Sequence, residues 1–531
     1  MPVSLVIRGG TVYDGLGGPG RTADLAIDGD RIAAVGAVPD TDGVRQIDAT
    51  GLAVAPGFIN ILSHAWGTLQ VEPQGPSDLL QGVTTEIFGE GLSLGPSNDD
   101  VQRAIAAERE DGQRMDFARL SEGLDYLESR GVAPNVASFV GGHNLRIIGG
   151  GLSDGPLSAQ ALDRLRGILD EEMADGALGI GTALIYPPGS FASTAELVAL
   201  SEVVARHDGL YISHMRSEAD QFLECLEELI EIGRRAGVRT EVYHLKAAGR
   251  ANWPKMSAAI ERIEAARAAG QATGANMYPY TAGGTALSSA IPPPYHDGGP
   301  AALAARLADP ARRAAMARDI AEPSDAWENL YLAAGGGQSI MLTSGSEPDE
   351  RLDGRWLADV AAERGRSDID TLLDVAAASP AMSAMYFMID ENNLQLGLRQ
   401  PWVSIGSDAG AAATRPPWTD RPIHPRTYGT YARVLGHYCR ELGLFPLAEA
   451  VRRMTSLPAD TLRLPGRGRL TPGAFADVAV FDPATVIDHA SYDQPHVYAA
   501  GVRHVIVNGQ PAVLDGELTG ALPGRRLRRG A

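Results

Sequence analysis

YISHMRSEAD (residues 211–220) and EVYHLKAAGR (residues 241–250) each place a histidine directly after a short run rich in β-branched and aromatic residues. Such runs are typical of β-strands. The stretches around them, such as LVALSEVVARH and FLECLEELIEIGRRAG, instead have the apolar periodicity of helices. This alternation predicts βα units built around a parallel sheet.

Eight candidate strands of this kind are spread along the middle of the chain. They lie at residues 54–62, 83–88, 135–140, 177–181, 210–213, 239–243, 272–276 and 402–406. Eight βα units predict an α/β fold, a (β/α)₈ TIM barrel over residues 55–460. The long interval between the seventh and eighth strands begins with the Pro- and Gly-rich stretch TAGGTALSSAIPPPYHDGGPAAL. We expect an insertion subdomain there, at about residues 284–355, over the barrel mouth.

The two ends of the chain have a different texture. Residues 1–54 and 461–531 contain short β-branched runs separated by turn signals, as in ADLAIDGDRIAAVG and VRHVIVNGQPAV. Each end is too short for a large core of its own. We therefore expect the two ends to pack together as one small composite β-sandwich domain.

The composition of the 531-residue chain excludes several classes of partner. Its 46 Lys and Arg against 66 Asp and Glu give a formal charge of −20, which disfavours nucleic acid. No long apolar run predicts a membrane span, and no signal peptide is evident. Two cysteines, Cys225 and Cys439, exclude a disulfide framework and fit a reducing compartment. We expect a cytoplasmic protein that acts on a small molecule. The sequence leaves its oligomeric state open, with a homo-oligomer as one alternative.

Polar residues follow almost every candidate strand. Barrel enzymes build their sites from the carboxyl ends of strands, so these residues are expected to converge. They are His64, Glu90, His143, His214, His244, Tyr278, Tyr280 and Asp408. A lone histidine at a strand end is usually structural, but several imidazoles with a carboxylate are the donor set of catalytic zinc. The spacing therefore predicts a zinc site in which His214 and His244, at the ends of adjacent strands, both bind the ion.

Nine stretches in order resemble the amidohydrolase superfamily, and within it the D-aminoacylase (N-acyl-D-amino-acid deacylase) family, over essentially the full length. They are LVIRGGTVYDG, GLAVAPGFIN, QGVTTEIFGEG, GALGIGTALIYPPG, YISHMRSE, YHLKAAG, YPYTAG, IGSDAG and HPRTYGTYARVLG. The resemblance implies zinc at the mouth of a barrel, beside a composite β-sandwich. It also implies hydrolysis of a linear amide bond, as in the deacylation of an N-acyl-D-amino acid.

The resemblance also implies roles for individual residues. His214 and His244 match zinc ligands of the family, and Asp408 matches its catalytic general base and acid. Lys246, one tyrosine of the YPY motif (Tyr278 or Tyr280) and Arg426 match positions that hold the substrate carboxylate and carbonyl. Basic groups of this kind suit a substrate that bears a carboxylate.

The chain departs from the family pattern in two places. Leu62 stands where the family has the first histidine of a His-x-His motif, which makes a second metal site doubtful. At the usual cysteine ligand the chain has GEGL, with Gly91 in the cysteine position and Glu90 one residue earlier. We expect one zinc ion held by Glu90, His214 and His244, with Glu86 as the alternative carboxylate.

Two histidines keep open roles. His64 is expected to hydrogen-bond the substrate, to bind a weak second ion or simply to pack as an imidazole. His143 is expected to contact the substrate or to be structural, and the structural role is favoured.

Two other functions remain open. The altered metal site could serve a cyclic amide or imide, or a peptide that contains a D-residue. Loss of a ligand could also leave a non-catalytic binding protein with the same fold. Against this second alternative, the chain retains the histidine pair together with Asp408, Lys246 and Arg426.

Overall fold

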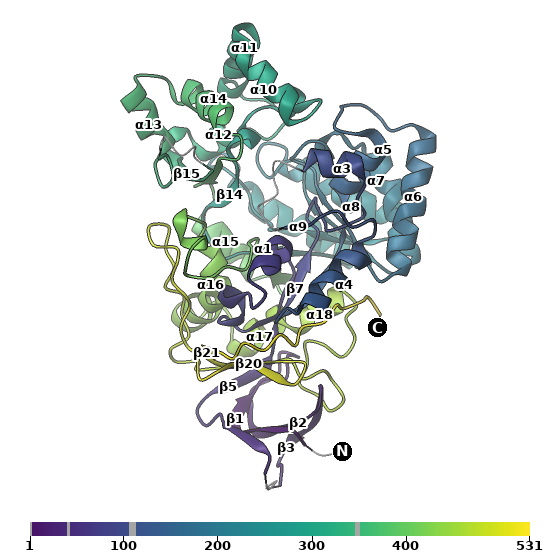
Figure 1. Ribbon diagram of the computed structural model, residues 1–531, viewed down its shortest axis with the longest axis vertical. Helices are drawn as coiled ribbons and strands as arrows, with labels where there is room; N and C mark the ends of the chain where they lie inside the picture. The colour runs from purple at the N-terminus through teal and green to yellow at the C-terminus, as the bar shows by residue number, and fades with distance from the viewer. Residues whose placement is uncertain (1–2, 40–42, 106–112, 346–350, 531) are drawn as a thin grey trace.

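The strands that carry the candidate site form two parallel sheets (Figure 1) in the computed structural model, which describes residues 3–39, 43–105, 113–345 and 351–530. One sheet has the order β6-β7-β8 and the other β17-β13-β12-β11-β10-β9. The bounds are β6 Phe58–Asn60, β7 Val83–Phe88, β8 Asn135–Ser138, β9 Val140–Gly141, β10 Gly179–Ala183, β11 Leu210–His214, β12 Arg239–Val242, β13 Thr273–Met277 and β17 Val403–Ile405. Each of the eight candidate strands overlaps at least one of these nine strands, and the candidate at residues 135–140 overlaps both β8 and β9.

Two local connections join the parallel sheets. Only Phe139 separates β8 from β9, and a parallel bridge pairs Ser63 with Ala409 beyond the ends of β6 and β17. Alternate strand residues such as Ile87, Ile212 and Tyr243 belong to one buried apolar cluster. Successive side chains of a strand point to opposite faces of the sheet. The residues next to these cluster members in each strand therefore point away from the cluster.

Amphipathic helices follow the strands and cover the parallel sheets. In α8 the buried residues recur at helical spacing, and Gly237 ends the helix in a left-handed conformation. The helices of this part are α1 Ala65–Val71, α2 Pro76–Leu79, α3 Asp99–Ala104, α4 Leu120–Arg130, α5 Gly142–Gly150, α6 Ala159–Ala174, α7 Thr194–Arg206, α8 Phe222–Ala236, α9 Lys255–Ala268, α15 Glu391–Leu398, α16 Arg426–Arg433, α17 Leu447–Met454 and α18 Ser456–Thr461.

The two ends of the chain share one nine-stranded sheet of order β21-β20-β19-β18-β5-β1-β2-β3, with β4 paired to β1. The join is the antiparallel pairing of β18 with β5, which sets Val478 opposite Pro56. Figure 1 shows these purple and yellow segments together at the bottom of the molecule. The bounds are β1 Leu5–Val12, β2 Arg21–Asp28, β3 Arg31–Gly36, β4 Arg45–Asp48, β5 Ala53–Pro56, β18 Val478–Phe481, β19 Val502–Val507, β20 Gln510–Leu514 and β21 Glu517–Leu518.

Between β13 and β17 the chain forms a separate unit, at the upper left of Figure 1, which we call the insertion. Its antiparallel sheet has the order β14-β16-β15. One of its strands, β16, lies beyond residue 355 in the sequence. Its elements are β14 Gly283–Ala286, α10 Pro300–Ala308, α11 Pro310–Ala321, α12 Leu330–Ala334, β15 Ile340–Ser344, α13 Leu357–Arg364, α14 Asp368–Ala378 and β16 Ser383–Tyr386.

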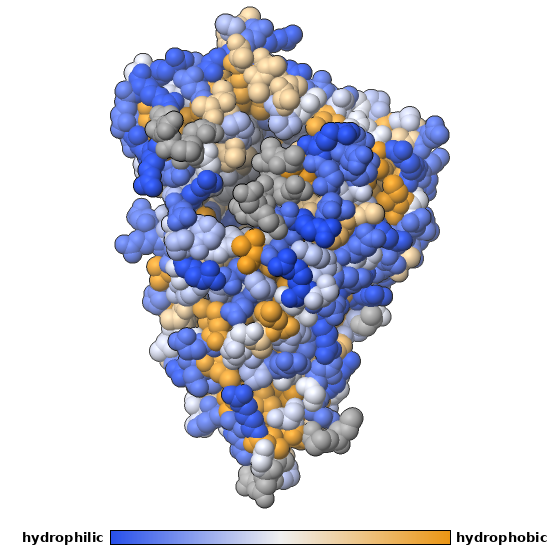
Figure 2. Space-filling model, viewed as in Figure 1, coloured by the Kyte–Doolittle hydropathy of each residue, from blue (hydrophilic) through white to orange (hydrophobic). Residues whose placement is uncertain are grey.

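Hydrophilic side chains dominate the face shown in Figure 2, with apolar patches scattered among them. This agrees with the large formal charge of the chain. Within the described ranges, no helix combines the length and the apolar character needed to cross a bilayer.

Candidate metal centre

Glu90 stands in a tight turn directly after β7. The glycines on both sides, Gly89 and Gly91, have φ angles of 108° and 67°. A Cβ atom on Gly89 would lie 2.4 Å from the carbonyl oxygen of Phe139, so a larger residue does not fit there. The turn leaves the Glu90 side chain with 6% exposure, facing the ends of the neighbouring strands.

His214 ends β11, and His244 comes two residues after β12. These strands are parallel neighbours, so both imidazoles emerge at the same edge. Their ring centroids lie 4.4 Å apart and the ring planes are nearly perpendicular. His244 has a φ of 36°, a strained conformation that is uncommon for a side chain of this size and frequent at functional sites.

Glu90 faces both of these histidines. Its Oε1 lies 2.9 Å from Nδ1 of His214 and 3.2 Å from Nε2 of His244. One donor atom from each residue lies within 4.8 Å of the other two. One carboxylate oxygen and two imidazole nitrogens at this spacing form a compact donor set for a metal ion.

A second group shares Glu90. Nε2 of His64 lies 3.2 Å from Glu90 Oε2 and 2.9 Å from Asp408 Oδ1. The other Asp408 oxygen lies 2.7 Å from Nη1 of Arg426. Asp408, like His244, has a positive φ, of 53°. Glu90 therefore presents one oxygen to the histidine pair and the other toward His64.

Comparison with known proteins bears on this arrangement. Residues 352–513 match the family described as the amidohydrolase family. The chain is 36% identical to D-aminoacylase of Alcaligenes xylosoxydans xylosoxydans, over 100% of this chain and 98% of that protein. It is 35% identical to N-acyl-D-glutamate deacylase of the same organism, over 100% and 97%.

The chain belongs to the D-aminoacylase family of amidohydrolases.

Solved structures of this family are also similar. One of them is a D-aminoacylase structure, described with a binuclear metal centre in which one metal activates and the second attenuates. Its similarity to this chain has a TM-score of 0.83 and 34% identity, over 99% of this chain and 100% of that chain. N-acyl-D-glutamate deacylase from Bordetella bronchiseptica, in complex with zinc and a phosphonate inhibitor, has a TM-score of 0.82 and 31% identity, over 99% and 100%.

Two of the alternative residues, Glu86 and Tyr280, lie away from the histidine pair. Glu86 accepts a hydrogen bond of 3.0 Å from Asn60 Nδ2. Burial raises the pKa of the Glu86 carboxyl group, and the nearby charge of Asp78 raises it further. Its neighbour Ile87 points into the apolar cluster, so Glu86 points to the opposite face of β7. The hydroxyl of Tyr280 faces Asp488 Oδ2 at 3.4 Å, and of the two YPY tyrosines only Tyr278 lines the cavity described below.

Leu62, at the family's histidine position, packs as a core residue with 1% exposure. Its carbonyl oxygen accepts a hydrogen bond of 2.9 Å from the backbone N–H of Asp408. The position that departs from the family pattern thus contributes backbone support to the site and no ligand atom.

The sequence reasoning missed Glu218, which lies behind the histidine pair with 2% exposure. Its Oε1 is 2.9 Å from Nδ1 of His244, and its Oε2 is 2.6 Å from Nζ of Lys246. The available signal was its position four residues after His214, in SHMRSE. Only the fold shows that it also reaches the next strand.

Burial and paired charges shift the pKa values of these groups in consistent directions. Burial opposes the charged form of Asp408, but Arg426 and His64 together lower its pKa to about 2. Glu218 likewise has its pKa lowered to about 2, against the effect of burial, chiefly by Lys246 and His244. Burial disfavours charge on His64, yet hydrogen bonds to Asp408 and Glu90 raise its pKa to about 10. The carboxylates are therefore held ionised.

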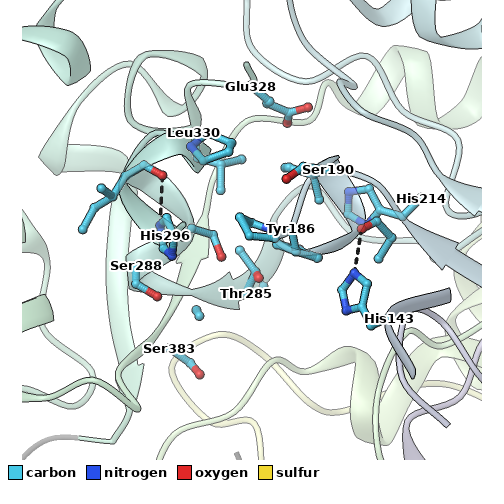
Figure 3. A pocket seen from close by; sticks show the side chains of 18 of the residues that line it. His143, Tyr186, Ser190, His214, Thr285, Ser288, His296, Glu328, Leu330 and Ser383 are labelled. Atoms are coloured by element: carbon cyan, nitrogen blue, oxygen red, sulfur yellow. Dashed lines mark hydrogen bonds between the residues drawn. The ribbon is translucent and has the colours of Figure 1, made fainter. Parts of the chain in front are cut away.

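A cavity of about 1100 Å³ opens above the metal centre, between the strand ends and the insertion (Figure 3). Arg426, Lys246 and Tyr278 line it, as do residues from the insertion such as Glu328. His143 lines it too, with Nε2 3.0 Å from the carbonyl oxygen of Ala183 and a pKa lowered by burial.

Tyr186 is another residue that the sequence reasoning missed. It lines the cavity, and its ring contacts that of His214 edge-on, with centroids 5.2 Å apart. Burial raises the pKa of its hydroxyl well above the usual value, so the hydroxyl stays a hydrogen-bond donor. Figure 3 shows Tyr186 at the centre of the cavity, between His214 and Thr285.

Proposed function

We propose that this chain is a zinc-dependent amidohydrolase that removes the acyl group from an N-acyl-D-amino acid. Family membership over the full length supports the reaction class. The observation that carries the proposal is the convergence of Glu90, His214 and His244 beside Asp408, in a cavity that also holds Lys246 and Arg426.

The donor set suits zinc. Nitrogen and carboxylate oxygen ligands are typical of catalytic zinc, which takes three protein ligands and keeps one position open. Glu90, His214 and His244 would hold the ion. When bound, zinc lowers the pKa of water from about 15.7 toward 7 and polarises a carbonyl group. His64 lies on the other side of Glu90 and is proposed to orient Asp408.

Asp408 is the proposed general base and acid. With Arg426 and His64 holding its pKa low, it is ionised at neutral pH and can accept a proton from the attacking water. It then delivers that proton to the nitrogen of the breaking amide bond. The contact between His64 Nε2 and Asp408 Oδ1 fixes the direction in which the carboxylate points.

Arg426 and Lys246 are the proposed contacts for the substrate carboxylate. Nη1 of Arg426 pairs with Asp408 Oδ2 at 2.7 Å, whereas Nε has no hydrogen-bond partner among the described residues. A guanidinium with an unused donor suits a carboxylate. Its Cζ lies over the ring of Tyr278, 4.6 Å from the ring centroid, and both residues line the cavity.

We also infer that the nine parallel strands, with β8 and β9 counted as one interrupted strand, close into a (β/α)₈ barrel over residues 55–460 and that residues 1–54 and 461–531 form one sandwich domain. The bridge between Ser63 and Ala409 and the pairing of β18 with β5 support this division. Cys225 and Cys439 are unpaired, which supports a cytoplasmic location.

The direct test is hydrolysis of matched N-acetyl-D- and N-acetyl-L-amino acids by purified protein of known zinc content. We expect turnover of a D-substrate that needs zinc and leaves the L-substrate uncleaved. Cyclic imides and peptides with a D-residue belong in the same panel, and hydrolysis of those alone would redirect the proposal. No hydrolysis of any member by the zinc-loaded protein would contradict it.

A further inference from the structure

Each histidine of the metal centre lies between two carboxylates. Glu90 faces Nδ1 of His214 and Nε2 of His244, as described above. The opposite ring nitrogens face Glu218: His244 Nδ1 at 2.9 Å from Oε1, and His214 Nε2 at 3.6 Å from Oε2. Nε2 of His214 is buried and has no hydrogen-bond partner among the described residues, and the Glu218 carboxylate is an acceptor that lies beside it.

This arrangement decides which ring nitrogens are free to bind a metal. A neutral imidazole carries one N–H and one lone pair. A carboxylate only accepts hydrogen bonds, so Glu218 favours the N–H on the nitrogens that face it. The lone pairs are then left on the nitrogens that face Glu90, where a metal ion needs them.

Lys246 acts in the opposite direction on His244. Its Nζ lies 2.8 Å from His244 Nδ1, and an ammonium group only donates hydrogen bonds. Without Glu218, the Lys246 ammonium group would favour a lone pair on His244 Nδ1. The N–H would then be on Nε2, and an Nε2 that carries a proton cannot bind a metal. Glu218 lies 2.6 Å from the same Nζ and offers it a charged acceptor instead. The balance at His244 therefore depends on where the Glu218 carboxylate is held.

The backbone of Glu218 is fixed from two sides. Its carbonyl oxygen accepts a hydrogen bond of 2.7 Å from the N–H of Ala248, in the loop after β12. Its N–H donates to Oε2 of Glu328, a residue of the insertion with 3% exposure that lies between α11 and α12. Figure 3 shows Glu328 and His214 on the wall of the same cavity.

We propose that Glu218 and Glu328 are positioning residues of the metal centre: Glu218 sets the tautomers of His214 and His244, and Glu328 holds Glu218 in place from the insertion. The inference rests on the proposed function, because it takes both histidines as zinc ligands. The insertion then supports the metal site as well as forming part of the cavity wall.

The first experiment measures zinc affinity of the full-length protein by chelator competition. Glu328→Met removes the acceptor for the Glu218 N–H and should weaken zinc binding by roughly tenfold. Glu328→Gln keeps an acceptor oxygen and should bind zinc as the wild type does. Glu328→Ala supplies a second truncation if the methionine variant does not fold.

Glu172 provides a matched control. It is buried, and its Oε2 accepts a hydrogen bond of 3.1 Å from the backbone N–H of Leu120, outside the cavity. Glu172→Met should therefore lower stability and leave zinc affinity unchanged. If wild-type protein binds zinc and Glu328→Met binds it equally well, the role of Glu328 is overturned while the proposed function stands. A wild-type protein that binds no zinc overturns both.

The second experiment tests the tautomer argument by rescue. Glu218→Met should weaken zinc binding by roughly 10- to 100-fold, the usual loss when a partner of a ligating histidine is removed. Adding Lys246→Met to it removes the competing donor and should restore zinc affinity at least partly, without restoring hydrolysis. A double variant that binds zinc as weakly as Glu218→Met would overturn the argument that Glu218 acts against Lys246.

Discussion

The substitution Asp408→Asn should remove the proposed proton transfer while leaving substrate binding and zinc binding in place. The asparagine keeps the shape of the side chain and can still face His64, now 2.9 Å from Oδ1, but it cannot take a proton from water. Loss of a general base costs roughly 10² to 10⁴-fold in kcat. We expect a loss in this range, with KM and zinc content close to those of the wild type, because the proposed ligands are Glu90, His214 and His244 and Asp408 belongs to the second donor group, with His64 and Glu90.

The same substitution leaves Arg426 buried without its counterion, so stability should also fall. Breaking a buried ion pair costs about 3 to 5 kcal/mol, which the asparagine amide reduces. Asp477→Asn is the matched control, because Asp477 and Arg467 form a buried pair near the shared sheet of the chain ends. It should lower the free energy of unfolding without lowering kcat. The reasoning is refuted if kcat of Asp408→Asn stays within a factor of ten of the wild type.

Further predictions concern binding, pH and metal. Lys246→Met should raise KM for carboxylate-bearing substrates more than it lowers kcat, measured by steady-state kinetics; an unchanged KM would remove Lys246 from the binding site. Tyr278→Phe should raise KM, whereas Tyr280→Phe should not, because the Tyr280 hydroxyl faces Asp488. Burial raises the pKa of Glu241 to about 7, from a usual value near 4.5. The free energy of unfolding therefore contains a favourable contribution from the protonated Glu241 carboxyl group, which is fully present below pH 4.5. This contribution is lost as the pH rises through 7. Glu241→Gln should be more stable than the wild type at pH 8, by on the order of 3 kcal/mol, and equal to it near pH 4.5; denaturant unfolding at both values tests this. Dialysis against a chelator should abolish hydrolysis, and zinc should restore it; activity that survives complete metal removal would count against the proposed reaction.

Much of the framework could be predicted from the sequence because strand periodicity is local. The run at residues 83–88 coincides with β7, and the histidines after β11 and β12 follow from chain order alone. Glu90 was harder to predict, because its direction depends on the positive φ angles of Gly89 and Gly91. Strand alternation points Ile87 into the core, so its neighbour Glu86 faces the other side of β7.

What the sequence did not indicate depends on contacts between distant segments. Glu218 and Glu328 are separated by 110 residues, and only the packing of the insertion against the loop after β11 brings them together. Tyr278 and Tyr280 look equivalent in YPY, but Tyr280 faces Asp488, near the far end of the chain. The pairing of β16 with β14 joins segments about a hundred residues apart, which local periodicity does not indicate.

Zinc binding by two glutamate variants tests the central claim most directly. Glu90→Gln and Glu86→Gln make the same chemical change four residues apart, one at the histidine pair and one on the opposite face of β7. The account predicts about one tightly bound zinc ion per chain in the wild type and in Glu86→Gln. In Glu90→Gln the affinity should fall by at least the roughly 10- to 100-fold that loss of a ligand's partner costs. Equal zinc binding by both variants, or none in the wild type, would contradict it.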